Sequence, residues 1–287
     1  MSQVKTISAP FEEIRAASTA GGGTALTTTL ALITLPENAD WVSCVAHNFV
    51  GALVAKVAFN PWLTVIRTAD LLASVGTDLS AELQDGDTTD VVMDAFDTLA
   101  NGDALYVGSW LPFRGARVTV GSDPQNTAST LTAKYWNGSG WVDLSATDGS
   151  ASGGATFAIT GNVTWTVPAA WRSASLQAID DVSEIIAAAA GAFAANFTPK
   201  APYVAPLYWT RWEVSAATEA TWNVVGLQPL NRSTLYSEYP EGFGVEMAVD
   251  AGSGGFSCVE ALVDAGTGSL VVNVATRFPT VSSRRFA

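Results

Sequence analysis

Residues 131–144 read LTAKYWNGSGWVDL and predict a β-hairpin. Strand-forming residues fill both arms, and Asn137-Gly138-Ser139-Gly140 separates them. An Asn-Gly pair favours the positive φ angles that tight hairpin turns require. A little further along the chain, residues 162–168 alternate apolar and polar side chains. This period of two is typical of a half-buried strand. The centre of the chain is therefore expected to be antiparallel β-structure.

Strand signals extend outward from this centre in both directions. They are runs of β-branched and aromatic residues bounded by Gly, Pro, Asn and Asp, at 41–45, 52–59, 62–68, 104–107, 117–120, 207–214, 245–249, 256–263 and 269–277. Residues 179–197 interrupt the pattern, because Asp180 or Asp181 could cap a helix through an Ala-rich run. We expect an all-β fold, a β-sandwich or jelly roll of two packed β units with one short Ala-rich helical insertion.

The predicted organisation has three parts. Residues 1–30, which include Gly21-Gly22-Gly23, are expected to form an N-terminal arm or linker. Residues 104–229 are expected to form a jelly-roll-like sandwich that carries the helical insertion 179–197. Residues 31–103 and 230–287 would then pair with each other as a discontinuous outer β unit.

The charge balance argues against nucleic acid as a partner. The chain has 27 acidic and 14 basic residues and a net charge of −13, whereas phosphate contacts need clustered Lys and Arg. The one basic cluster, Arg284-Arg285, is either a solvated tail or a docking arm for an acidic surface. No apolar run reaches the length of a membrane span and no signal peptide is visible, so we expect synthesis in the cytoplasm and no membrane partner.

Catalytic motifs are not evident in the sequence. The single histidine, His47, has no recognisable nucleophile or orienting carboxylate beside it in the sequence. Glu213, Asp143 and Asp148 could in principle form a glycosidase pair, but we interpret them as solvated strand faces and turn caps. We therefore expect a non-enzymatic protein without a cofactor.

Metal and disulfide signals are also weak. Asp85, Asp87 and Asp90 do not match a calcium loop of the EF-hand type, because Asp90 and Phe96 occupy the positions that need Gly and Glu. They are interpreted as a capped turn, and another kind of calcium site stays open. Cys44 and Cys258 are interpreted as buried thiols, although the sequence does not decide whether they pair.

Ten tryptophans form the most conspicuous side-chain class. Alternation predicts that Trp165 and Trp209 fill the core. Trp136 and Trp141 flank the hairpin turn and are the candidate contact residues, since Trp anchors protein interfaces and stacks on sugar rings.

An ordered set of motifs resembles a β-sandwich module of tailed-bacteriophage virion proteins. The set covers about 110 residues and runs through 106–109, 112–115, 135–141, 147–149, 163–168, Trp171 and 208–212. The resemblance implies a virion component, in the head or the tail, and carries over no catalytic residue. The helical insertion departs from the short connection usual at that point.

From the resemblance and the absent chemistry we expect a capsid decoration, or cement, protein in the virion. It would be a homo-oligomer that binds the major capsid protein or other virion proteins between capsomers. The alternative is a tail or baseplate component whose sandwich binds a host glycan through Trp136 and Trp141. A glycan depolymerase is a third hypothesis without a positive signal.

Overall fold

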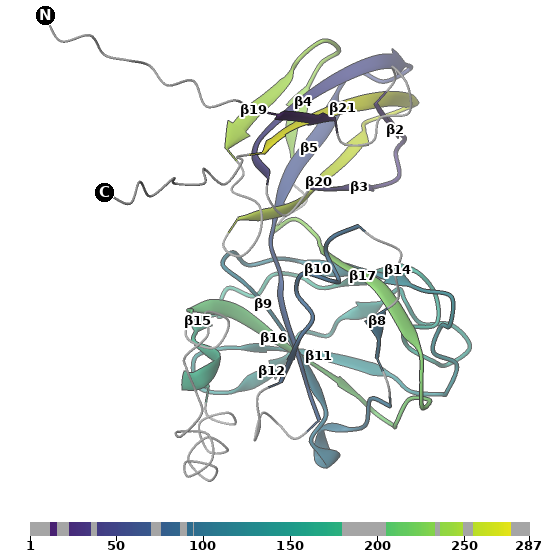
Figure 1. The fold of residues 1–287 in the computed structure, drawn as a ribbon, viewed down its shortest axis with the longest axis vertical. Coiled ribbons are helices and arrows are strands. Elements are labelled where there is room, and N and C mark those ends of the chain that lie inside the picture. Colours follow the sequence, from purple (N-terminus) through teal and green to yellow (C-terminus); the bar gives the residue numbers. More distant parts are fainter. Residues whose placement is uncertain are drawn as a thin grey trace, which may run out of the picture.

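The computed structural model contains two β-sandwiches stacked end to end (Figure 1). It describes residues 12–15, 23–35, 39–69, 76–86, 91–93, 95–179, 205–232, 236–248 and 255–276. Within them every strand pair is antiparallel, and the described helical turns are the short Leu99–Asn101 and Leu176–Ala178. The expected all-β fold is confirmed.

The outer sandwich is built from the two ends of the described chain. One of its sheets has the order β1-β21-β4-β19, with β2 also on β21, and the other has the order β18-β5-β20-β3. Its strands are β1 (Glu12–Arg15), β2 (Thr24–Leu26), β3 (Ala31–Thr34), β4 (Ala39–Val50), β5 (Ala55–Pro61), β18 (Ser237–Tyr239), β19 (Gly244–Ala248), β20 (Phe256–Val263) and β21 (Thr267–Thr276).

Alternation along the strands builds the core of the outer sandwich. In β4, Val42, Cys44 and Ala46 are fully buried, while the residues between them are not. The facing strand positions follow the same period, which is the pattern of a strand with one face on a core. The core is therefore aliphatic and small, with Leu26, Val57, Val259, Ala261, Leu270, Val272 and Val274 among its members.

The inner sandwich holds the centre of the chain. One sheet has the order β12-β11-β16-β9-β6-β7, with β15 also on β16, and the other has the order β13-β14-β10-β17-β8. Its strands are β6 (Thr64–Thr68), β7 (Thr77–Asp78), β8 (Val91–Val92), β9 (Ala104–Ser109), β10 (Gly115–Val120), β11 (Leu131–Trp136), β12 (Trp141–Asp143), β13 (Thr147–Asp148), β14 (Gly161–Thr164), β15 (Ser173–Ala174), β16 (Leu207–Val214) and β17 (Asn223–Pro229).

Successive long strands of the inner sandwich alternate between its two sheets. β9, β11 and β16 lie in one sheet, and β10, β14 and β17 lie in the other, which is a feature shared with jelly rolls. The predicted hairpin is present, because β11 pairs with β12 and Trp136 lies opposite Trp141. Asn137 Oδ1 accepts from the backbone N–H groups of Ser139 and Gly140 and so fixes the turn.

Aromatic rings fill the inner core, as predicted for Trp165. The buried indoles of Trp165, Trp171, Trp212 and Trp222 pack around Phe113 and Phe157. Each indole N–H donates a hydrogen bond inside the protein, to Phe113 O, Trp209 O, Thr210 Oγ1 and Thr218 Oγ1 respectively. These bonds satisfy the polar end of each buried ring.

Strand pairing moves the expected boundary between the two units. We expected the inner sandwich to begin at residue 104, but β6 pairs with β9 and β8 pairs with β17. Residues 64–92 therefore contribute strands to the inner sheets, and the chain enters the inner sandwich directly after β5. The predicted strand at 62–68 contains β6, whereas β7 and β8 have two residues each and lie outside the predicted strands.

The predicted N-terminal arm also needs correction. Within residues 1–30, β1 and β2 pair with β21 and so belong to the outer sandwich. Leu26, in β2, is fully buried in the core of the outer sandwich. The predicted helix within 179–197 lies, apart from Ile179, outside the described residues.

Candidate functional site

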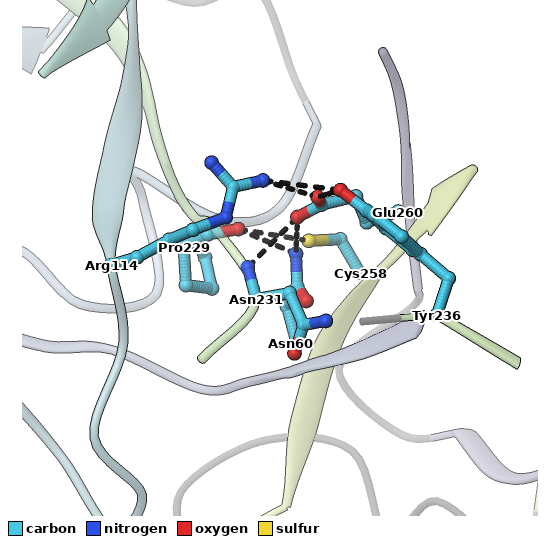
Figure 2. Close-up of polar contacts among 7 residues, drawn as sticks. All are labelled: Asn60, Arg114, Pro229, Asn231, Tyr236, Cys258 and Glu260. Carbon is cyan, nitrogen blue, oxygen red and sulfur yellow. Dashed lines mark hydrogen bonds and ion pairs between the residues drawn. The ribbon is translucent and has the colours of Figure 1, made fainter. Parts of the chain in front are cut away.

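A polar network around the buried Glu260 and Asn60 joins the two sandwiches (Figure 2). Glu260 projects from β20 of the outer sandwich, and its side chain is completely buried. Arg114 comes from the residue before β10 of the inner sandwich, and its Nη2 lies 2.5 Å from Glu260 Oε1. The Tyr236 hydroxyl donates to the same oxygen. We call this cluster, with Asn60 and Asn231, the joint.

The second carboxylate oxygen of Glu260 is bound by amide groups. Asn60 Nδ2 donates to Glu260 Oε2 at 2.9 Å, and the Asn231 backbone N–H donates to it at 2.8 Å. Asn60 Nδ2 also donates to Pro229 O at 2.7 Å, at the end of β17. The carboxylate therefore ties the end of β5, the end of β17 and the start of β10 to β20.

Local backbone constraints hold Arg114 in place. Its carbonyl accepts from the Trp165 N–H at 2.8 Å. The next residue, Gly115, has φ 149°, and a Cβ there would lie 2.1 Å from Val163 O. Only glycine allows the close approach of β10 and β14 at this point. The Arg-Gly pair of the motif at 112–115 thus directs the guanidinium toward the outer sandwich.

Further contacts across the joint surround the network. Trp110 Nε1 donates to Gly255 O at 2.8 Å, and the Trp110 ring packs on Phe256 with 5.6 Å between ring centroids. Gln228 Nε2 donates to Thr34 Oγ1 at 2.6 Å. Apolar and polar contacts both cross the boundary between the two sandwiches. The joint therefore lies within a packed interface and is not an isolated ion pair.

Burial sets the electrostatics of the joint. Desolvation, together with the hydrogen bond to Glu260, raises the pKa of Tyr236 to about 12, so the phenol stays protonated and donates. A buried carboxylate is tolerated where its charge is paired and its lone pairs are satisfied. Arg114 supplies the counter-charge and the other three donors supply hydrogen bonds. This arrangement can fix an orientation between two units.

Sequence reasoning missed the joint, although one signal was present. Glu260 is the one charged residue of β20, with buried Val259 and Ala261 on either side. A carboxylate in such a run is seldom buried unless it is paired. Its partner could not be found from sequence, because Arg114 lies 146 residues away.

The two candidate contact tryptophans have different environments. Trp136 has only 4% of its surface exposed, so the expectation that it is exposed is wrong. The β16 sheet is covered on both faces, and Trp136 packs in a second cluster with Tyr106, Trp209 and Leu176. Trp209 is fully buried there, which confirms its predicted role in a core.

Trp141 is partly exposed and lies beside a group of charges. The Arg211 guanidinium carbon is 4.9 Å from the centre of the Trp141 ring, which is a cation–π arrangement. Arg211 also pairs with Glu213 at 2.8 Å, and Lys134 pairs with the other oxygen of Glu213 at 2.9 Å. Trp141 is the candidate contact residue whose exposure fits its prediction.

The carboxylates considered for catalysis have structural partners. Glu213 was expected to be solvated, but its side chain is only 12% exposed and pairs with two cations. Asp143 accepts from the Ser145 N–H, and Asp148 accepts from the Ser150 N–H and the Thr156 hydroxyl. The prediction that these two aspartates cap turns is confirmed.

The cysteines are buried, as predicted, and both are free, which the sequence did not decide. Cys44 lies in β4 and Cys258 in β20, so they occupy different sheets. Burial raises the pKa of each thiol to about 12. Both sulfur atoms are therefore kept protonated and away from solvent at neutral pH.

Some predicted features cannot be placed. Asp87, Asp90, Arg284 and Arg285 lie outside the described residues. Across the ranges that are described, no group of three or more His, Cys, Asp or Glu could hold a metal ion. Nor does that part of the chain include a helix with the length and hydropathy of a membrane span.

Three large apolar side chains are exposed at the end of the outer sandwich away from the joint. Val50 and Leu53, at the β4–β5 turn, are 70% and 77% exposed, and Phe243 is 65% exposed. The turn is ordered by Asp264, whose Oδ1 accepts from the Leu53 and Val54 N–H groups. These bonds lower the pKa of Asp264. We call Val50, Leu53 and Phe243 the tip residues.

Comparison with known protein families, with curated proteins and with solved structures finds no match for this chain.

Proposed function

We propose that this chain is a non-enzymatic structural protein of a tailed-phage virion, and that it decorates the head by binding between capsomers. The proposal rests on the ordered motifs between residues 106 and 212, which resemble a virion β-sandwich module. The residues of those motifs have structural roles: Arg114 pairs across the joint, and Trp165, Trp171 and Trp212 fill the inner core.

The joint supports a function in making contacts. A decoration protein must transmit force between its neighbours. Two sandwiches joined by a flexible linker would transmit it poorly. Arg114 and Glu260, with the apolar contact of Trp110 and Phe256, join the two sandwiches through a buried interface. Such an interface fixes the orientation of the two sandwiches, so a partner bound to each would be held in a defined position relative to the other.

The tip residues offer a contact surface for a neighbouring virion protein. Solitary exposed apolar residues are ordinary, but three large ones at one end mark a candidate interface. Val50, Leu53 and Phe243 are presented by turns that the carboxylates of Asp264 and Glu241 hold through backbone N–H groups. An ordered turn loses little conformational entropy on binding.

Imaging the purified particle of the phage that encodes this chain, at a resolution that traces side chains, tests the proposal. Density repeated over the head lattice, with the tip residues or the inner sandwich against a capsomer, is the expected result. Density confined to the tail axis or baseplate would favour the second candidate below. If the purified particle lacks the chain, the virion proposal is overturned.

The second candidate is a tail or baseplate protein that binds a host glycan. The partial exposure of Trp141, together with the partly exposed Lys134 on the neighbouring strand, favours it, because sugar rings stack on exposed indoles and their hydroxyls bond to charged groups. A glycan array measured with the native chain and with Trp141→Ala tests it. Binding that the substitution removes would support this candidate, and an array without any binding would count against it.

A further inference from the structure

The strand β19 forms one edge of the outer sandwich. Among the described residues it is the last strand of its sheet and pairs with β4 alone. It has five residues, whereas the strands at the other described sheet edges have two to four. Proteins usually keep an edge strand short or interrupt it with proline, lysine or a bulge, because an open edge pairs with other strands. None of these devices occurs within β19, whose register with β4 is continuous.

The backbone of β19 directs polar groups to its open side. The Ala46 N–H donates to Phe243 O at 3.0 Å, so this carbonyl faces β4. Because the direction alternates along an antiparallel pair, the N–H and C=O groups of Gly244 and Glu246 point away from β4. Both residues are exposed. β19 therefore offers donors and acceptors in the arrangement that an added strand needs.

Apolar side chains lie along the same edge. Val245 and Met247 pack against the outer core but are only half-buried, and Phe243 is 65% exposed. These residues follow at every second position, so they share one face of the sheet. At the opposite edge, β2 covers the core with the fully buried Leu26. A strand with apolar side chains at the same period would cover the β19 edge in a similar way.

A second copy of β19 fits this edge in one register. When Val245 lies opposite Val245 of the second copy, Met247 lies opposite Phe243 and Glu246 lies opposite Gly244. The outward N–H and C=O groups of Glu246 and Gly244 then bond to each other across the two-fold axis. An axis at Glu246 would instead oppose two carboxylates, which destabilises a strand pair. An axis at Gly244 would place the apolar Met247 against the charged Glu241.

We propose that two copies of this chain associate through β19, each pairing antiparallel with the other about a two-fold axis at Val245. The sheet that contains β4 and β21 then continues from one copy into the next. The same surface of each copy forms the contact, as a two-fold dimer requires. Phe243 is one of the tip residues, so the dimer covers it and leaves Val50 and Leu53 for another partner. The inference does not depend on the proposed virion function.

A proline at position 246 separates the dimer contact from the fold of one chain. The Glu246 N–H points away from β4, so Glu246→Pro removes a hydrogen bond of the dimer and none between β19 and β4. We expect sedimentation of the native chain to show a dimer that grows with concentration. Glu246→Pro should raise its dissociation constant by about tenfold or more, because symmetry removes two hydrogen bonds at once. Glu246→Ala keeps the N–H and is the control that should still dimerise.

Single-cysteine variants test the register. Phe243→Cys and Met247→Cys are prepared separately, one with a mass tag, then mixed and oxidised mildly. The two positions oppose each other in the proposed dimer, within the range of a disulfide. Each variant alone is the matched control, because its two cysteines would lie about 13 Å apart along the strands. We expect the disulfide between chains to form several-fold faster in the mixture. Cys44 and Cys258 are buried and do not compete.

Three results would overturn the proposal. A native chain that sediments as a monomer at every concentration would exclude the dimer. A Glu246→Pro variant with native tryptophan fluorescence that dimerises like the native chain would place the interface elsewhere. Equal cross-linking in the mixture and in the single variants would exclude the register, and this measurement decides the matter even if Glu246→Pro does not fold.

Discussion

Arg114 and Glu260 belong to different sandwiches, and their charged groups lie 2.5 Å apart in the joint. The Glu260 side chain is fully buried and that of Arg114 is 17% exposed. A pair of this kind is costly to break, because removal of one partner leaves the other charge poorly solvated. The contribution of this pair to the free energy of unfolding is therefore best measured by substituting one member and leaving the other in place.

We expect Glu260→Gln to lower the free energy of unfolding by about 3 kcal/mol, since it leaves Arg114 without a counter-charge. Urea unfolding followed by tryptophan fluorescence measures the loss. The control is Glu238→Gln, because Glu238 pairs with Lys56 at 3.8 Å on the surface, where an ion pair contributes about 0–1 kcal/mol.

Arg114→Met combined with Glu260→Met should lower the free energy of unfolding by less than the sum of the losses from the two single substitutions. Additive losses would disprove coupling between the two residues.

Gly108 lies directly opposite Trp209 in the β9–β16 pair. A Cβ at position 108 would lie 2.5 Å from the Trp209 ring, which is fully buried. Gly108→Ala should therefore destabilise the protein by about 1–3 kcal/mol through overpacking. Gly140→Ala, where a Cβ meets nothing within 4 Å, is the control in the same thermal or urea titration. Equal effects of the two substitutions would contradict the packing seen at Trp209.

The raised pKa of Tyr236 predicts a loss of stability in alkali. Desolvation in the joint is the main cause of the raised pKa, which is about 12 in the folded chain against 10 for an ordinary tyrosine. The folded state therefore holds the phenolic proton more tightly, so this stabilisation is complete below pH 10 and is lost as the pH rises toward 12. Unfolding free energies at pH 9 and pH 11 should fall less for Tyr236→Phe than for the native chain. An equal fall in both would refute the assignment.

The buried thiols predict a simple reactivity pattern. Burial raises the pKa of Cys44 and Cys258 to about 12, and only a thiolate reacts quickly with a disulfide reagent. We expect no reaction of the native chain with such a reagent at pH 8 and reaction of both thiols after denaturation. A native thiol that reacts at the denatured rate would place that cysteine at the surface.

Local sequence patterns predict most of the strands because alternation and turn residues act over a few neighbours. The hairpin around Asn137 and the strands at 207–214 and 256–263 are examples in which the sequence and the structure agree. The residues of β6 and β8 were assigned to the wrong unit, because only their partners β9 and β17 identify their sheets.

The joint and the environment of Trp136 depend on contacts that the local pattern does not contain. Glu260 looks like a surface charge until Arg114 is placed beside it. Trp136 was expected to be exposed because one face of a hairpin usually contacts solvent. In the structure, the sheet that contains β16 packs against a separate apolar cluster on each of its faces. Predicting either requires the packing of whole sheets.

The pairing of Glu12 with Thr276 brings the first and last described residues together on adjacent strands. Neighbouring strands are about 5 Å apart, so a short peptide could join position 12 to position 276 and close the chain into a circle. The inner sandwich, which the chain enters after Pro61 and leaves at Pro229, could then be opened at one of its turns to give new termini. In such a circular permutant the outer sandwich would become one continuous segment, and cargo could be attached at the far end of the molecule instead of beside β1.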